Sequence, residues 1–193
     1  KPDAVLVQGD TTTVMTVAWA CFYHRIPIGH VEAGLRTWDM QNPFPEEANR
    51  VIAGKLARSH LAPTECSRQN LLKDGVPDSE IIVTGNTVID ALLMTAAKDL
   101  ELAVPLDPTK RLVLVTSHRR ENFGEPFRNI CRALRTLAQT NPAVQFLYPV
   151  HPNPNVKDVA HEFLAGLQNV TLCEPLDYAP FIARMKRAYL ILP

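Results

Sequence analysis

The sequence "AVLVQGDTTTVMTVAWACFYHRIPIGHV", residues 4–31, has two short runs of apolar and β-branched residues on either side of a longer segment with helical periodicity. The pattern predicts a strand over residues 4–8, a helix over 12–23 and a second strand over 26–31. Two strands joined through a helix form a parallel βαβ unit. This stretch therefore predicts an α/β fold.

The same alternation continues to residue 85 and restarts near residue 112, after a helix and a Pro-bearing segment. Further strands are predicted over 59–63, 81–85, 112–117, 144–150, 170–173 and 189–193, and further helices over 46–57, 65–75, 88–100, 126–139, 156–167 and 178–188. We therefore predict two Rossmann-like units, a partial N-terminal domain over residues 1–85 and a partial C-terminal domain over 86–193, with helices on both faces of each parallel sheet. Because the sequence opens and closes on strands, we expect a piece of a longer chain.

Composition narrows the class of protein. Twenty Lys and Arg residues balance twenty Asp and Glu residues, so no overall field favours nucleic acid or a membrane surface as a partner. No apolar run is long enough to span a bilayer, and no signal peptide precedes the first strand. The widely spaced cysteines predict reduced thiols in a cytoplasmic protein, without a disulfide framework or a metal site; they are Cys21, Cys66, Cys131 and Cys173.

Ligands of parallel α/β sheets sit beyond the carboxyl ends of the strands, so the residues after each strand are candidates for function. Asp10, in "QGDTTT" (8–13), can serve in a site, or it or a following Thr can cap the next helix. Glu32, in "HVEAGLRT" (30–37), has no helix to cap, so we expect its carboxylate to project into a cleft. His30 and Glu32 match half of a zinc-deaminase motif, but no P-C-x-x-C follows, which excludes that class.

The segment "PFPEEANR", residues 43–50, places two carboxylates at the start of a predicted helix. Acids in a first helical turn complement the helix dipole, so a capping role competes with a catalytic one. We expect Glu46 to act in catalysis and Glu47 to be a capping and surface residue. Arg50, one turn after Glu46, is expected to orient the Glu46 carboxylate or lower its pKa.

Two loops in the second half carry basic residues. In "TSHRRENFG" (116–124), His118, Arg119 and Arg120 follow a strand and can bind a phosphate or diphosphate, although a solvated loop with internal ion pairs has the same composition. His118 can also act as a general acid. His151, in "VHPNPN" (150–155), lies in a Pro-bounded loop that is either a site element or only a turn.

Absent motifs exclude several kinds of chemistry. The sequence has no GxGxxG, no GxxxxGK[ST] and no GxSxG, so it does not support NAD-type binding, P-loop chemistry or an α/β-hydrolase. We therefore expect no cofactor.

Taken together, the loops resemble those of the non-hydrolysing UDP-N-acetylglucosamine 2-epimerases of bacteria, in order and spacing and over essentially the whole sequence. The motifs are "QGDTTT", "HVEAGLRT", "PFPEEANR", "TECSRQNLL", "VTGNTVIDAL", "SHRRENFG" and "YPVHPNPNV". The resemblance implies a glycosyltransferase-B-like fold, in which two Rossmann-like domains, both incomplete here, hold a UDP-sugar between them. The family's first strand and its serine-glycine-glycine phosphate loop are not in this sequence, so we expect this chain alone to be inactive.

The resemblance also implies an activity: C2 epimerisation between UDP-N-acetylglucosamine and UDP-N-acetylmannosamine, through elimination and re-addition of UDP. Alternatives are a hydrolysing relative, a glycosyltransferase on the same fold, or a catalytically incompetent sugar-nucleotide-binding fragment. The complete protein is expected to be a homodimer.

The resemblance assigns roles by matching positions. Asp10, Glu32 and Glu46 match acidic active-site residues, and His118 matches a catalytic or nucleotide-contacting histidine. Residues expected to bind the substrate, uridine or an activating second UDP-sugar are Arg50, Arg119, Arg120, His151, Leu176 and Phe181.

Overall fold

A computed structural model of the chain describes residues 1–101, 104–117 and 123–193. The chain forms two compact units, unit 1 (Lys1–Asp90) and unit 2 (Ala91–Pro193). The boundary between them lies within helix α4 (Thr87–Ala96), just after the division between residues 85 and 86 that the sequence suggested. This helix is shorter than the predicted 88–100, and a Pro-containing segment follows it.

Unit 1 is a four-stranded parallel sheet with the strand order β1-β2-β3-β4. Its strands are β1 (Val5–Gln8), β2 (Ile28–Val31), β3 (Ser59–Ala62) and β4 (Ile81–Val83). Its helices are α1 (Thr12–Tyr23), α2 (Glu46–Leu56), α3 (Glu65–Lys73) and a 3₁₀ turn at Asp78–Glu80.

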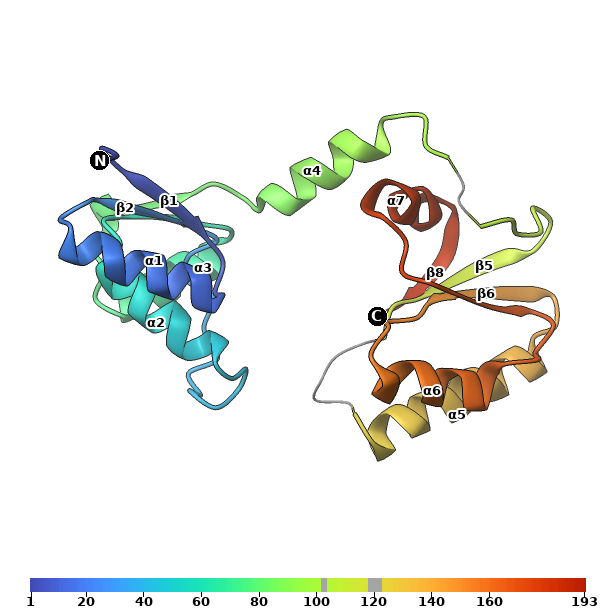
Figure 1. The fold of residues 1–193 in the computed structure, drawn as a ribbon. Coiled ribbons are helices and arrows are strands. Elements are labelled where there is room, and N and C mark those ends of the chain that lie inside the picture. Colours follow the sequence, from blue (N-terminus) through green and yellow to red (C-terminus); the bar gives the residue numbers. More distant parts are fainter. Residues whose placement is uncertain (102–103, 118–122) are drawn as a thin grey trace. The chain divides into compact units, whose positions relative to one another are not determined.

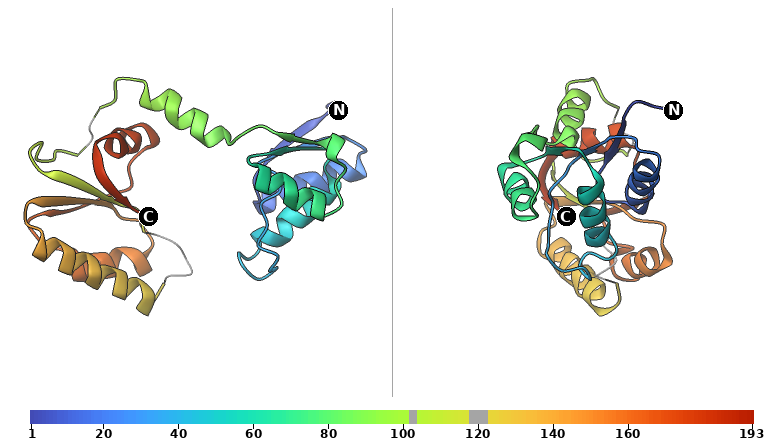
Figure 2. Two further views of the ribbon diagram at one scale, coloured as in Figure 1. Left: turned by 180° about the vertical axis from the view of Figure 1, so that it is seen from behind. Right: turned by 90° about the vertical axis from the view of Figure 1, so that its left-hand side faces the viewer.

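Helices α1, α2 and α3 all cover the same face of the unit 1 sheet. Val7 packs with α1 and α2, whereas Ile81 packs with α3. The strand register aligns Val7, His30, His60 and Ile81 across the sheet, so these side chains share one face. In Figures 1 and 2, α1 and α2 correspondingly lie together on one side of β1 and β2.

The prediction of helices on both faces is therefore wrong for unit 1, as far as the structure describes it. The physical reason is the strand order. When strands are added in one direction through right-handed connections, each helix lands on the same face, and only a reversal of direction fills the other face. The opposite face of this sheet exposes apolar side chains, with Leu6 72% and Ile82 57% exposed.

Unit 2 contains a second parallel sheet, with the order β7-β6-β5-β8. Its strands are β5 (Arg111–Val115), β6 (Val144–Pro149), β7 (Val170–Cys173) and β8 (Ala188–Leu192). Its helices, beyond the end of α4, are α5 (Glu125–Thr140), α6 (Pro154–Leu164) and α7 (Tyr178–Arg187).

The direction in which strands are added to the sheet reverses in unit 2. Strands β6 and β7 are added on one side of β5, and β8 then pairs with β5 on its other side. Val113 and Val115 of β5 pack with α5 and α6, whereas Leu112 and Leu114 pack with Met185 of α7. Alternate residues of one strand thus contact helices on opposite faces. Figure 1 shows the same arrangement, with α5 and α6 on one side of the sheet and α7 on the other. The prediction of helices on both faces is confirmed for unit 2.

No helix among the described residues is long and apolar enough to cross a membrane. All four cysteines are free: Cys21 and Cys131 are buried, Cys66 is exposed, and Cys173 is half-buried.

Gly34 fixes how the segment after β2 packs on α3. Its φ of +89° is in a region that favours glycine, and an ideal Cβ there would lie 2.3 Å from the Ser67 carbonyl oxygen and 2.9 Å from Leu71 Cγ. The Gly34 carbonyl also accepts a hydrogen bond from Asn70 Nδ2 at 3.0 Å. The position therefore excludes a side chain for both conformational and steric reasons.

We predict that Gly34→Ala lowers the free energy of unfolding by about 3 kcal/mol or more, because the new methyl group must displace the α3 backbone. Gly75→Ala is a matched control. Gly75 has a φ of +83° but nothing within 4 Å of its ideal Cβ, so the cost should be only the conformational one of about 1 kcal/mol. Urea unfolding of both variants measures the difference, and equal losses would contradict the steric argument.

Candidate active site

Two acidic residues follow neighbouring strands of unit 1. Asp10 lies two residues beyond β1 and Glu32 directly follows β2, and these strands pair in parallel. Gly9, with a φ of +80°, donates its N–H to the Val31 carbonyl at 3.0 Å, and an ideal Cβ on it would lie 3.5 Å from Glu32 Oε2. The Gly9 backbone therefore lies beside the Glu32 carboxylate at the carboxyl edge of the sheet.

Asp10 does not cap helix α1. The Thr11 hydroxyl oxygen accepts the capping hydrogen bond from Val14 N at 3.3 Å. The Asp10 carboxylate instead binds Arg50, whose Nε and Nη2 donate to Oδ2 at 2.9 and 2.7 Å. Asn49 Nδ2 donates to the Asp10 carbonyl at 2.8 Å. Helix α2 thus holds both the backbone and the carboxylate of Asp10.

Glu47 links this pair to the preceding loop. Its Oε2 accepts from Arg50 Nη1 at 3.0 Å, and its Oε1 accepts from the Trp38 backbone N–H at 3.1 Å. Burial by itself would raise the pKa of Glu47, but hydrogen bonds from the Thr37 and Trp38 backbone and from Arg50 outweigh it and lower this pKa. Glu47 is 1% exposed, so the interpretation of Glu47 as a surface residue is wrong.

Glu46 lies in the first turn of α2 and is half-buried. Within the described part of the chain, no hydrogen bond or ion pair involves its carboxylate. Arg50 pairs with Asp10 and Glu47, so the expectation that it orients Glu46 is also wrong. Spacing alone does not decide between the two glutamates, because i+3 and i+4 neighbours are both within reach on a helix. Arg50 binds the buried Glu47, and the tertiary fold brings Asp10 to the same guanidinium.

Asn49 and Asn86 are site neighbours that the sequence argument did not select. Asn86, after β4, donates from Nδ2 to Glu32 Oε1 at 3.3 Å. Asn86 lies beyond the carboxyl end of a strand, and this position could have identified it from the sequence as a candidate for function. Asn49 carried no such signal, because its contact with Asp10 depends on how α2 packs beside α1.

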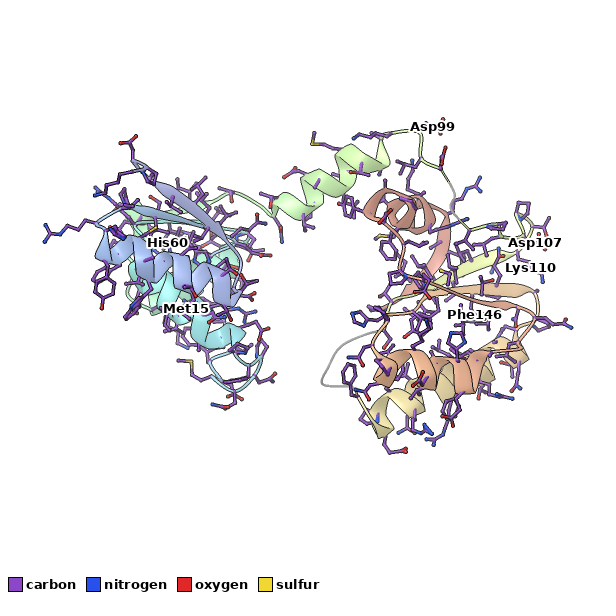
Figure 3. All side chains as sticks on the ribbon, viewed as in Figure 1. Met15, His60, Asp99, Asp107, Lys110 and Phe146 are labelled. Atoms are coloured by element: carbon purple, nitrogen blue, oxygen red, sulfur yellow. The ribbon has the colours of Figure 1, made fainter. Side chains whose placement is uncertain are left out.

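Two buried histidines lie under these loops on adjacent strands. His30 Nε2 donates to the Gly9 carbonyl at 2.8 Å, which fixes the loop that carries Asp10. His30 pairs in register with His60, and each is 1% exposed. Burial, followed by the neighbouring His30 and Arg36, lowers the pKa of His60 to about 4. Burial also lowers the pKa of His30. His60, a residue of β3, is labelled in Figure 3.

Unit 2 has a cavity of about 220 Å³ at the carboxyl ends of its strands. Three residues singled out from the sequence line it together: His151 after β6, Leu176 after β7 and Phe181 in α7. Its remaining lining residues are Val115, Thr116, Pro149 and Pro175. This is where strand order reverses around β5, the place at which open α/β sheets bind ligands.

Three of the predicted basic residues, His118, Arg119 and Arg120, lie outside the described residues. In residues 1–101, 104–117 and 123–193, no group of three or more His, Cys, Asp or Glu side chains could hold a metal ion.

The sequence and the structure both match one family. The profile of the family described as UDP-N-acetylglucosamine 2-epimerase covers residues 1–193. The UDP-N-acetylglucosamine 2-epimerase of Salmonella typhimurium is 54% identical over 202 residues, covering all of this chain and 54% of the relative. That of Yersinia pestis is 52% identical over 204 residues, with the same coverage. The chain thus spans about half the length of the curated relatives it matches.

Solved structures agree. The Neisseria meningitidis UDP-GlcNAc 2-epimerase bound to UDP-GlcNAc has a TM-score of 0.91 at 42% identity, covering 98% of this chain and 54% of that chain. The Methanocaldococcus jannaschii enzyme in complex with UDP-GlcNAc and UDP has a TM-score of 0.78 at 32% identity, with the same coverage.

The two parallel α/β units match solved structures of the glycosyltransferase-B type over 98% of this chain, so the protein has this type of fold. The chain belongs to the UDP-N-acetylglucosamine 2-epimerase family, which confirms the resemblance inferred from the loops.

We predict that Glu47→Gln lowers the free energy of unfolding of unit 1 by about 2 kcal/mol, because an amide nitrogen would then face the Arg50 guanidinium in a buried position. Both tryptophans of the sequence, Trp19 and Trp38, lie in unit 1, so urea unfolding followed by tryptophan fluorescence reports on this unit. Glu46→Gln, one position earlier, should change the value by less than about 0.5 kcal/mol. The reverse order of these two effects would contradict the assigned contacts.

We also predict that the free energy of unfolding of unit 1 falls as pH falls from 6.5 towards 4. The folded pKa of His60 is below its unfolded value, so the unfolded chain takes up the proton first and is favoured by acid. The size is about 3 kcal/mol, from 1.36 kcal/mol for each unit of pKa difference. His30, whose pKa burial also lowers, contributes a slope of the same sign. Stability measured against pH should therefore lose the His60 part of this slope in His60→Gln and keep the whole slope in His24→Gln, since His24 is exposed.

Proposed function

We propose that the complete protein interconverts UDP-N-acetylglucosamine and UDP-N-acetylmannosamine by inverting C2. Family membership and the names of relatives with about 50% identity support this proposal. The solved relatives bound to UDP-GlcNAc or UDP support a UDP-sugar as the substrate.

The observation that carries the proposal is the pair of carboxylates, Asp10 and Glu32, at the ends of two hydrogen-bonded parallel strands. Glu46, at the start of α2, is the third carboxyl group that we assign to the reaction. These three acids have different surroundings. Asp10 is paired with Arg50, Glu32 with Asn86, and Glu46 forms no hydrogen bond with the described residues. Different environments allow carboxyl groups of one site to take different proton-transfer roles.

The reaction needs more than one such group. The C2 hydrogen of the sugar is not beside a carbonyl, so direct removal at neutral pH is unfavourable. When UDP leaves C1 with the bonding electron pair, the oxocarbenium-like centre makes the C2 proton removable by a carboxylate, which gives a 2-acetamidoglucal. Protonation of C2 from the other face and return of UDP to C1 complete the inversion. Two faces require a base on one side and an acid on the other.

The cavity of unit 2 is our candidate for the nucleotide. Phe181 and Leu176 offer apolar surface for the uracil base, and His151 adds a polar group. We assign His118, Arg119 and Arg120 to the diphosphate, because cations that hold the leaving group keep UDP bound until it returns. A role for His151 or Arg119 in activation by a second UDP-sugar is part of the same proposal.

Incubation of the complete protein with UDP-N-acetylglucosamine in deuterated water tests the proposal. We expect both epimers to accumulate with deuterium at C2, because the proton removed from one face exchanges with solvent before the other face is protonated. Epimerisation without solvent deuterium would refute the carboxylate mechanism. Release of free N-acetylmannosamine would instead indicate a hydrolysing relative, and a transferred sugar would indicate a glycosyltransferase.

We predict that Glu46→Gln in the complete protein lowers kcat by about 10²- to 10⁴-fold, the range typical for loss of an acid–base group. Glu65→Gln is the matched control, because Glu65 is likewise a glutamate in the first turn of a helix but is exposed and pairs with Arg68. Steady-state assays should show unchanged kcat for Glu65→Gln. Comparable losses of kcat in both variants would mean that Glu46 only stabilises the start of its helix and takes no part in proton transfer.

A further inference from the structure

A second and larger cavity of unit 2 lies at the opposite edge of the sheet from the candidate nucleotide pocket. It encloses about 380 Å³. Lys110 precedes β5, Gln145 is the second residue of β6, and Arg187 precedes β8, so the cavity lies at the amino ends of these strands. Figure 3 labels Asp107 and Lys110 on the loop that enters β5. The cavity is therefore separate from the carboxyl edge and its site.

Arg184 of α7 lines this cavity and is only 3% exposed. Its Nε and Nη2 atoms are buried without a hydrogen-bond partner among the described residues. Burial, and then the neighbouring Arg187, lower the pKa of Arg184, while Cys173 opposes the shift. A guanidinium nevertheless stays charged in proteins, and a buried charge without a partner is strongly unfavourable. The arrangement calls for an anion.

The unpaired atoms form the edge of the guanidinium that binds oxyanions side-on. In unit 1, Arg50 uses the same two atoms, Nε and Nη2, to hold the Asp10 carboxylate. Such a fork matches the oxygens of a carboxylate or a phosphate. Arg184 lines the cavity, so this guanidinium lies at the cavity wall.

The buried side-chain amide of Gln145 holds the segment before β5, which also lines the cavity. Gln145 Nε2 donates to the Asp107 carbonyl at 2.6 Å and to the Lys110 carbonyl at 3.1 Å, and its Oε1 accepts from Asp107 N at 3.0 Å. The Asp107 carboxylate accepts from Thr109 N and Oγ1 at 2.9 and 2.6 Å. The one acid of the lining therefore binds within its own turn, and it is not paired with Arg184.

The helix dipole explains part of the positive charge at the end of α7. Basic residues in a last helical turn complement the helix dipole, and Arg184, Lys186 and Arg187 all lie in the last turn of α7. That accounts for the exposed Lys186 and Arg187. It does not account for a buried guanidinium with two unpaired nitrogens at the wall of a cavity.

We propose that this cavity binds a small phosphate ester, with the phosphate on Arg184, Lys110 and Arg187 and the organic part against Val104, Leu106 and Leu112. Three cations and one carboxylate line the cavity, which leaves a surplus of two positive charges. A phosphate monoester carries about −1.5 to −2 at neutral pH and matches this surplus better than a carboxylate does. The volume is within the range of small-molecule sites and larger than a phosphate ion needs.

Calorimetric titration of the complete protein tests the proposal, with inorganic phosphate and phenyl phosphate as the probes. The protein is first saturated with UDP, so that the nucleotide pocket is filled. We expect saturable binding of one phenyl phosphate, more tightly than inorganic phosphate, and at least a tenfold loss of affinity in Arg184→Met. Lys186→Met, on the same helix but outside the cavity, should bind as the unmodified protein does.

A second measurement does not depend on titration of the variant. Arg184→Met removes an unpaired buried charge, so its melting temperature without phosphate should equal or exceed that of the unmodified protein, and phosphate should no longer raise it. Lys110→Met, which leaves Arg184 in place, should also weaken binding. The proposal is overturned if the unmodified protein does not bind either probe, or if Lys186→Met loses as much affinity as Arg184→Met. It is also overturned if a structure of the complete protein shows a carboxylate of its own chain bound to Arg184.

Discussion

The direction in which successive parallel strands are added determines where the helices and functional loops of this chain lie. In unit 1 the strands follow in the order of the sequence, which places α1, α2 and α3 on one face and leaves Leu6 and Ile82 exposed on the other. In unit 2 the return of β8 to β5 moves α7 to the second face. Handed crossover connections make this outcome a consequence of strand order alone.

Strand direction also determines at which edge of a sheet each candidate site lies. Parallel strands present all their carboxyl ends at one edge, so Asp10 and Glu32 follow neighbouring strand ends in unit 1, and His151 and Leu176 line one cavity in unit 2. Helix α7 runs back across the sheet of unit 2 and carries Phe181 in the carboxyl-edge cavity and Arg184 in the amino-edge one. One helix therefore contributes to two chemically different cavities.

Buried charge distinguishes two kinds of arginine in this protein. Arg50 is shared between Asp10 and Glu47, and Asn49 supports the same loop, so its charge is compensated and the Asp10 carboxylate is held in place. Arg184 is more deeply buried and has no such partner among the described residues. The Arg50 charge is therefore compensated within unit 1, whereas the buried guanidinium of Arg184 carries an energetic cost that no described side chain offsets.

The sequence by itself determined the alternation of strands and helices, the α/β class, the family and the loops that carry chemistry, because these depend on local periodicity and on motifs that are contiguous in the chain. It did not determine that Glu47 is buried, that Arg50 pairs with Asp10, or that α1, α2 and α3 all pack on the same face of the first sheet. Those features depend on which residues meet across helices and strands far apart in the sequence. "PFPEEANR" shows the difference: its helix start could be predicted locally, but which of its two glutamates faces the interior depends on how α2 packs beside α1, and only the tertiary structure decides that.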